Sequence, residues 1–130
     1  MATNFPAVLA AAAAGFLVGW IWYSIFGGAW RAGLGPSAPR STPILLVLAA
    51  IANLVMAAML SGVLFHTGLW TWHGGMISGA LLWTGFVLTT VGVSESFQNR
   101  PPSVIAIDVG HWLFVLLAMG TILGTFGQPG

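Results

Sequence analysis

Residues 102–126 read PSVIAIDVGHWLFVLLAMGTILGTF, an apolar run that contains Asp108, one of the two acidic residues in the chain. A helix of about 20 such residues is long enough to cross the hydrocarbon core of a bilayer. The run therefore predicts a transmembrane helix with a carboxyl group inside the membrane. Because an acid at that depth is costly unless it faces protein, Asp108 is expected to point into a bundle of several helices.

The composition of the whole chain is that of a membrane protein. Of its 130 residues, 58% are apolar and 4% are charged, far from the balance found in soluble domains. The net charge of +1 supports neither a nucleic-acid surface nor a polybasic lipid-binding patch. Cysteine is absent, which excludes disulfides, thiolate metal sites and cysteine nucleophiles. We expect the lipid bilayer as a partner, no nucleic acid, and no cofactor or metal.

Polar or helix-breaking residues divide the chain into four apolar stretches, approximately 5–26, 43–65, 73–96 and 102–126. The first loop, GGAWRAGLGPSAPRSTP, is rich in glycine and proline and is expected to lie outside the hydrocarbon. Pro101 and Pro102 suit the first turn of the last helix, where a missing N–H costs little. The sequence therefore predicts an all-α fold, with residues 1–130 forming a single integral membrane bundle of four transmembrane helices.

The arginines predict how the bundle is oriented. Arg31 and Arg40 lie in the first loop and Arg100 lies in the third, so all three fall on one side of a four-helix threading. Loops rich in Arg and Lys tend to face the cytoplasm, and both termini are therefore expected on the other side. The residues before the first apolar run include no base, so we expect a retained helix rather than a cleaved signal peptide.

Aromatic side chains gather near both predicted interfaces, where amphipathic rings anchor helices among the headgroups. Five are expected to be such anchors: Trp22, Tyr23, Trp30, Trp70 and Trp72. Three lie deeper and are expected to pack against other helices: Trp20, Trp83 and Trp112.

Glycine spacing predicts close contacts between helix backbones. Three G-x-x-x-G pairs occur in the apolar stretches: Gly15–Gly19, Gly75–Gly79 and Gly120–Gly124. Small residues at this spacing let two helices approach closely. The pairs predict tight packing either within the bundle or between subunits, so a homo-oligomer is compatible with the sequence.

The last helix has a polar face that is separate from its glycine face. At about 100° per residue, Asp108 and His111 fall on one side, and Gly120 and Gly124 fall on another. With a rise of about 1.5 Å per residue from Pro102, Asp108 lies roughly 9 Å and His111 roughly 14 Å below the cytoplasmic end. Both side chains are expected to face the interior of the bundle.

Side chains of the other helices lie at similar predicted depths and are candidate partners for this polar face. They are Tyr23, Glu95 and Arg100 in the cytoplasmic third, Trp20 slightly deeper, and Asn53 near the depth of His111. Arg100 is placed to pair with Glu95 or with Asp108. The Tyr23 hydroxyl or the Trp20 indole is placed to donate to the Asp108 carboxylate.

Two interpretations of this cluster stay open. In one, it is a polar network that fixes the register of the helices. In the other, Asp108 and His111, at positions i and i+3, form a proton-handling or substrate-binding site, as buried ionisable groups in membranes often do. One carboxylate and one imidazole are too few ligands for a metal ion. His66 and His73 fall at the opposite face of the membrane and cannot complete such a site.

Three stretches of the chain also carry a family resemblance: GWIWYSIFGGAW at 19–30, GALLWTGFVLTTV at 79–91, and ESFQNRPPSVIAIDVGHWLFVLLAMGTILG at 95–124. In this order they resemble the bacterial membrane proteins grouped as domain of unknown function 1761. The positions that match the family pattern are Trp22, Tyr23, Phe26, Trp30, Gly85, Phe86, Phe97 and Arg100. The resemblance implies a four-helix protein of the bacterial inner membrane and implies no activity. The stretch HTGLWTWHGG looks particular to this chain.

Three classes of function fit these observations. The first, which we favour, is binding or transport of a small solute or proton by an oligomeric bundle, through the region of Tyr23, Asp108 and His111. The second is a structural or accessory subunit of a larger membrane complex, with tryptophans and glycines contacting other membrane subunits. The third is a membrane enzyme acting on a lipophilic substrate, which the lack of a nucleophile or cofactor motif disfavours.

Overall fold

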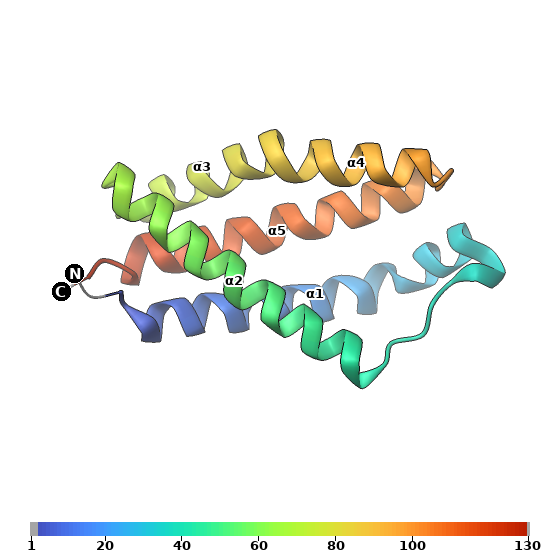
Figure 1. Ribbon diagram of the computed structural model, residues 1–130, viewed down its shortest axis with the longest axis horizontal. Coiled ribbons are helices and arrows are strands. Elements are labelled where there is room, and N and C mark those ends of the chain that lie inside the picture. The colour runs from blue at the N-terminus through green and yellow to red at the C-terminus, as the bar shows by residue number, and fades with distance from the viewer. Residues whose placement is uncertain (1–2, 130) are drawn as a thin grey trace.

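A computed structural model describes residues 3–129 and contains four helical passages long and apolar enough to cross a membrane (Figure 1). The first is α1 (Phe5–Leu34), which continues into the short helix η1 (Gly35–Ser37), and the second is α2 (Pro43–Thr67). The third consists of α3 (Trp72–Leu82), η2 (Trp83–Val87) and α4 (Leu88–Phe97), and the fourth is α5 (Pro102–Phe126). The predicted all-α bundle of four membrane helices is confirmed.

The helices begin and end where the local sequence favours it. The side chain of Asn4 accepts from Ala7 N at the start of α1, and Thr71 accepts from Gly74 N at the start of α3. These caps satisfy N–H groups that the first turn of a helix leaves unpaired. Gly68 ends α2 with a φ of 72°, a left-handed conformation that glycine adopts without steric cost.

Helix α1 is longer than the sequence indicated. The predicted first span ends at residue 26, whereas α1 continues to Leu34. Gly27 and Gly28 lie inside this helix, where nothing approaches within 4 Å of the Cβ position, and the residues after them include good helix formers. The added turns place Trp30 beside α5, which the predicted loop would not have done.

Helix α5 lies at the centre of the fold. In Figure 1 it runs between α1 on one side and the α3–α4 passage on the other, and α2 crosses in front at an angle. The two chain ends lie together at one end of the bundle, and the loops after η1 and α4 lie at the other. Asn4 helps to hold the ends together, because its Nδ2 donates to the carbonyl of Phe126 at 2.9 Å.

The hydrophobic core occupies the half of the bundle that contains the termini. Its fully buried members include Ala11 from α1, Leu60 and Leu64 from α2, and Met119 and Leu123 from α5. In α2 no residue before Asn53 is buried. The first half of α2 therefore diverges from α1 and α5, and the half of the bundle that contains the arginine loops is less tightly filled.

The predicted glycine pairs lie at contacts within the chain. A Cβ atom on Gly75 would coincide with backbone atoms of Gly120, and one on Gly79 would come within 2.6 Å of the Leu116 carbonyl oxygen. Gly124 packs in the same way on the backbone of Thr71. These glycines let α3 and α5 approach backbone to backbone.

Candidate functional site

Asp108 lies in the interior of the bundle, as the sequence predicted, and is only 9% exposed. Its Oδ1 accepts two hydrogen bonds from α1, one from the Tyr23 hydroxyl at 2.5 Å and one from the Trp30 indole Nε1 at 2.9 Å. Hydrogen bonds to a charged acceptor are stronger than those between neutral groups. The carboxyl group therefore joins α5 to the half of α1 that lies nearer the first loop.

Two further indoles bind the backbone on either side of Asp108. Trp22 of α1 donates to the Ile107 carbonyl at 3.0 Å, and Trp83 of η2 donates to the Val109 carbonyl at 2.7 Å. A carbonyl oxygen has two lone pairs, so each can accept an indole N–H in addition to its helical partner. We call Trp22, Tyr23, Trp30 and Trp83 the aromatic donors, since all of them bind residues 107–109 of α5.

The aromatic donors correct an expectation drawn from the sequence. Trp22, Tyr23 and Trp30 were expected to anchor the bundle among lipid headgroups. Instead, the polar atom of each binds α5. The reason is that α5 offers a carboxylate and backbone carbonyls in a medium with few other acceptors, and an N–H or O–H in such a medium needs a partner.

Among the described residues, neither Trp20 nor Arg100 donates a hydrogen bond to Asp108. Trp20 is 60% exposed, and the second donor to Asp108 is Trp30 instead. Arg100 donates its Nε–H to the Gln98 side chain at 3.1 Å. Glu95 of α4 lies close enough to interact with both Asp108 and Arg100, so the two acidic residues of the chain are neighbours. Its Oε1 is buried and has no hydrogen-bond partner within residues 3–129.

His111 lies one turn beyond Asp108 on the same face of α5 and is 7% exposed. Its ring packs between Tyr23, with centroids 5.1 Å apart, and Trp112, with centroids 4.5 Å apart. Its Nε2 faces α1 at Gly19, where an added Cβ would come within 2.8 Å. The Nδ1 atom is buried and makes no hydrogen bond to the described part of the chain.

Asn53 occupies the equivalent depth on α2 and is 4% exposed. Its Nδ2 donates to the Ala49 carbonyl at 2.8 Å. Its Oδ1 packs against Gly15 of α1 and has no hydrogen-bond partner among residues 3–129. A buried polar atom without a partner is uncommon in folded proteins.

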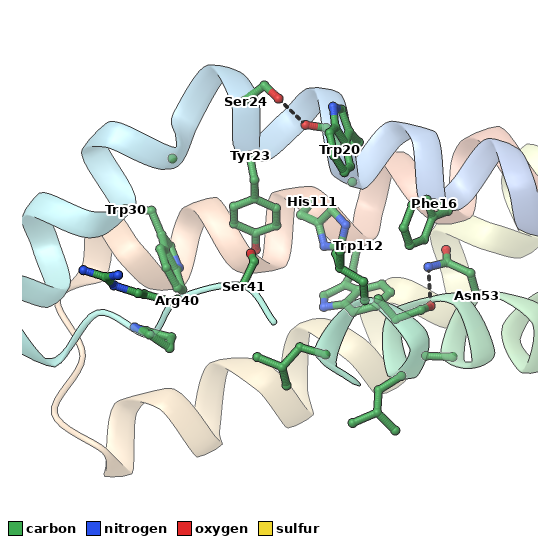
Figure 2. A pocket seen from close by; sticks show the side chains of 18 of the residues that line it. Phe16, Trp20, Tyr23, Ser24, Trp30, Arg40, Ser41, Asn53, His111 and Trp112 are labelled. Carbon is green, nitrogen blue, oxygen red and sulfur yellow. Dashed lines mark hydrogen bonds between the residues drawn. The ribbon is translucent and has the colours of Figure 1, made fainter. Parts of the chain in front are cut away.

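A pocket of about 720 Å³ lies where α2 diverges from α1 and α5 (Figure 2). We call it the arginine-end pocket. Tyr23, His111 and Asn53 line it, and so do Trp20, Trp30 and Trp112. Arg31, Arg40 and Ser41 line it near the first loop. In Figure 2 the rings of Tyr23 and His111 point from α1 and α5 toward the same space.

The structure brings most of the predicted site residues together. Tyr23, Trp20, His111 and Asn53 line one pocket. Asp108 does not line it, because the Tyr23 and Trp30 side chains bind its carboxylate. Glu95 and Arg100 lie near the α4 end of the network, outside the pocket lining. Asp108 therefore acts on the pocket through the side chains that it positions.

Sequence reasoning missed three residues of this region. Trp22 and Trp83 bind backbone carbonyl groups of α5. Every residue has such a carbonyl group, so the sequence does not indicate which ones accept an indole N–H. Trp30 was placed in a loop because of the Gly27–Gly28 pair. A helical extension of α1 would have placed Trp30 seven residues, or about two turns, beyond Tyr23 and on the same face.

His66 and His73 lie near the opposite end of the bundle. Their rings pack against the neighbouring Phe65 and Trp72, with centroids 5.4 Å and 5.3 Å apart. Within residues 3–129, no group of three His, Cys, Asp or Glu side chains is arranged to hold a metal ion.

Comparison with known families identifies the chain. Residues 6–124 match the family described as "Protein of unknown function (DUF1761)". The chain belongs to this family. The match covers all four helical passages nearly from end to end, as the resemblance in the three quoted stretches indicated. Comparison with curated proteins gives no match, and neither does comparison with solved structures.

Proposed function

We propose that this DUF1761 protein binds a small solute in the arginine-end pocket, within the membrane. The observation that carries the proposal is the pocket itself, which has a volume of about 720 Å³ and is lined by aromatic rings and by Tyr23, His111 and Asn53. Ligand sites are typically concave and mostly apolar, with a few polar groups that converge on the ligand. The arginine-end pocket has this composition.

Unsatisfied polar atoms support this proposal. Asn53 and His111 both line the pocket, and behind its wall each has a buried polar atom without a partner in the described residues: Asn53 Oδ1, which packs against Gly15, and His111 Nδ1. Polar residues inside membranes are costly, and they commonly mark substrate pathways. A network that served helix register alone would be expected to satisfy these atoms.

In this proposal Asp108 is a positioning residue. Its carboxylate accepts a hydrogen bond from the Tyr23 hydroxyl, so the phenolic oxygen offers a lone pair rather than an O–H donor to the pocket. It also fixes Trp30, which forms part of the pocket wall. A solute that donates a hydrogen bond would suit this arrangement.

Proton binding at Asp108 is a second candidate. The observation that favours it is the neighbouring Glu95, because ionisable side chains inside membranes often belong to proton relays. Proton flux into vesicles that is lost in Asp108→Asn would favour this candidate over a solute.

We further propose that the protein works as a homo-oligomer in the bacterial inner membrane. The arginine-end pocket is partly open beside α2, and a second copy seated there would enclose it. The alternatives are an accessory subunit of a larger complex, which would bind other chains instead, and an enzyme, which would show turnover that depends on Asp108 and His111.

The test is native mass spectrometry of the protein purified from membranes in mild detergent. We expect a defined homo-oligomer that retains a small molecule. Ala52→Phe places a large side chain in the pocket wall and should remove that molecule, whereas Val55→Phe, on the exposed face of the same helix, should retain it. A bound molecule that Ala52→Phe leaves in place would contradict the proposal. A monomer attached to other chains would favour the accessory role.

A further inference from the structure

We propose that the solute is a membrane lipid with an anionic phosphate headgroup, bound with its headgroup at Arg31 and Arg40 and one apolar chain along the seam between α1 and α2. This inference rests on the proposed function, because it names the class of ligand for the same pocket. It is carried by a second cavity that continues the first and by the distribution of charge between the two.

The second cavity has a volume of about 640 Å³ and lies farther along α1, toward the termini. Phe16 and Trp20 line both cavities, so the two adjoin. The remaining walls of the second cavity are apolar side chains of α1 and α2, including Leu9, Leu17 and Leu54. Among residues 3–129, the indole N–H of Trp20 is the one polar side-chain group in its lining. We call it the apolar groove.

The arginine-end pocket is basic at the end that lies farther from the apolar groove. Arg31 and Arg40, two of the three basic residues in the chain, line it together with Ser41. In the part of the chain that the structure describes, no acidic residue lines either cavity. Arginine binds phosphate through paired N–H groups in a fixed geometry. In Figure 2, Arg40 and Ser41 lie on the same side of the pocket as Trp30.

The two cavities together have the polarity of a lipid. Arg31 and Leu9 are 22 residues apart on α1, which at about 1.5 Å per residue corresponds to about 33 Å. This is close to the roughly 30 Å of a full hydrocarbon core, so a chain from one leaflet, about 15 Å long, reaches from Arg31 to the region of Trp20, where the apolar groove begins. The charged end lies next to a loop, where headgroups are found, and the apolar groove runs back through the membrane. A soluble anion would use the arginines but would leave the groove unoccupied.

The experiment measures quenching of tryptophan fluorescence by lipids with brominated chains in reconstituted vesicles. Trp20 borders both cavities, so a bromine atom in the groove would quench it. Brominated phosphatidylglycerol is compared with brominated phosphatidylcholine of the same chains, each added to vesicles of unbrominated phosphatidylcholine. We expect half-maximal quenching at a lower mole fraction of phosphatidylglycerol, by about fivefold for each arginine involved.

Charge variants distinguish the site from general attraction to the surface. Arg31→Gln and Arg40→Gln should each reduce the preference for phosphatidylglycerol. Arg100→Gln, which removes the third arginine at the same end of the bundle but does not touch the pocket, should keep it. Equal quenching by the two lipids, or an equal loss of preference in Arg100→Gln, would overturn the inference. All three arginines lie in or beside loops, and thermal unfolding checks that each variant folds.

Further measurements identify the source of the phosphate and distinguish the lipid proposal from the proposal of solute binding. Dodecyl phosphate should relieve the quenching by competition, and inorganic phosphate should not, because it cannot fill the groove. Competition by inorganic phosphate at equal concentration would overturn the lipid assignment. If Ala52→Phe removes a bound molecule in mass spectrometry while phosphatidylglycerol shows no preference, the lipid class is wrong and solute binding stands. If Ala52→Phe removes nothing, the pocket proposal itself fails.

Discussion

At the scale of single residues, the most informative feature is that Asp108 is bound by neutral donors. Tyr23 and Trp30 both donate to the same carboxylate oxygen, and their rings meet edge to face with centroids 5.8 Å apart. A buried acid bound by an arginine would be neutralised and held as an ion pair. Here the hydrogen bonds orient the acid without adding an opposite charge.

We expect Tyr23→Phe and Trp30→Phe each to destabilise the bundle by about 1–3 kcal/mol, because each leaves the buried carboxyl group with one donor fewer. Thermal unfolding in mild detergent measures the effect. Trp20→Phe is the matched control, since Trp20 is exposed and its indole does not bind Asp108; it should change stability little. The loss from Tyr23→Phe should be smaller when combined with Asp108→Asn, and strictly additive effects would argue against the direct bond.

The sequence predicted part of this network for a physical reason. An acid in an apolar helix must face protein, so the inward orientation of Asp108 follows from solvation alone, and Tyr23 was among the donors expected at its depth. The role of Trp30 depended on where α1 ends, and helix ends are the least predictable feature of an apolar sequence. The contact between Arg100 and Gln98 depends on the local path of the α4–α5 loop, which no pattern indicates.

At the scale of helices, the contact between α3 and α5 is made of backbone. Gly75 and Gly120 face each other so closely that neither leaves room for a side chain on the other. In lipid, helices gain little from hydrophobic burial against one another, so such close packing is a main source of their association. This contact holds α5 against the third passage and thereby brings Trp83 to Val109.

We expect Gly120→Ala to destabilise the bundle by about 1–3 kcal/mol, the usual cost of overpacking a filled interior. Gly92→Ala is the control, because nothing lies within 4 Å of its Cβ position in α4. It should be neutral or stabilising by about 0.5–1 kcal/mol, since alanine favours helix more than glycine does. Both are measured by thermal unfolding in the same detergent, and equal effects of the two would contradict the close contact.

The four spans were predictable because length and apolarity alone define a membrane helix. The wide turn η2 (Trp83–Val87), a π-helical segment, was not predictable from the sequence. A π-helical turn inserts a residue into an α-helix, and in a stretch where nearly every residue is apolar, the added residue breaks no hydrophobic period. The glycine pairs predicted close packing but not which helices would meet.

At the scale of the whole molecule, the positions of the loops make the proposed orientation testable. The loop after η1 and the loop after α4 lie at the same end of the bundle, and the chain ends lie at the other. Arg40 and Arg100 are in these two loops, and Arg31 is in the last turn of α1 at the same end. The positive-inside tendency predicts that this end faces the cytoplasm.

Because the chain contains no cysteine, single cysteines can report this orientation directly. Ser37→Cys and Gln98→Cys lie at exposed positions of the arginine end, and Thr67→Cys lies at an exposed position of the other. In intact spheroplasts, a membrane-impermeant maleimide should label Thr67→Cys, and should label the other two only after permeabilisation. The reverse pattern would mean an inverted bundle, and labelling of all three in intact spheroplasts would mean a mixture of orientations.

The way α2 is held has a mechanical consequence. Its 25 residues span about 37 Å at about 1.5 Å per residue, more than the roughly 30 Å of hydrocarbon, and a helix of this length commonly tilts in the membrane. Only its second half is fixed to the core, and the free half forms one wall of the arginine-end pocket. A thicker bilayer is therefore expected to bring α2 more upright and narrow the pocket. The width of the pocket would then depend on the thickness of the bilayer as well as on the packing of the helices.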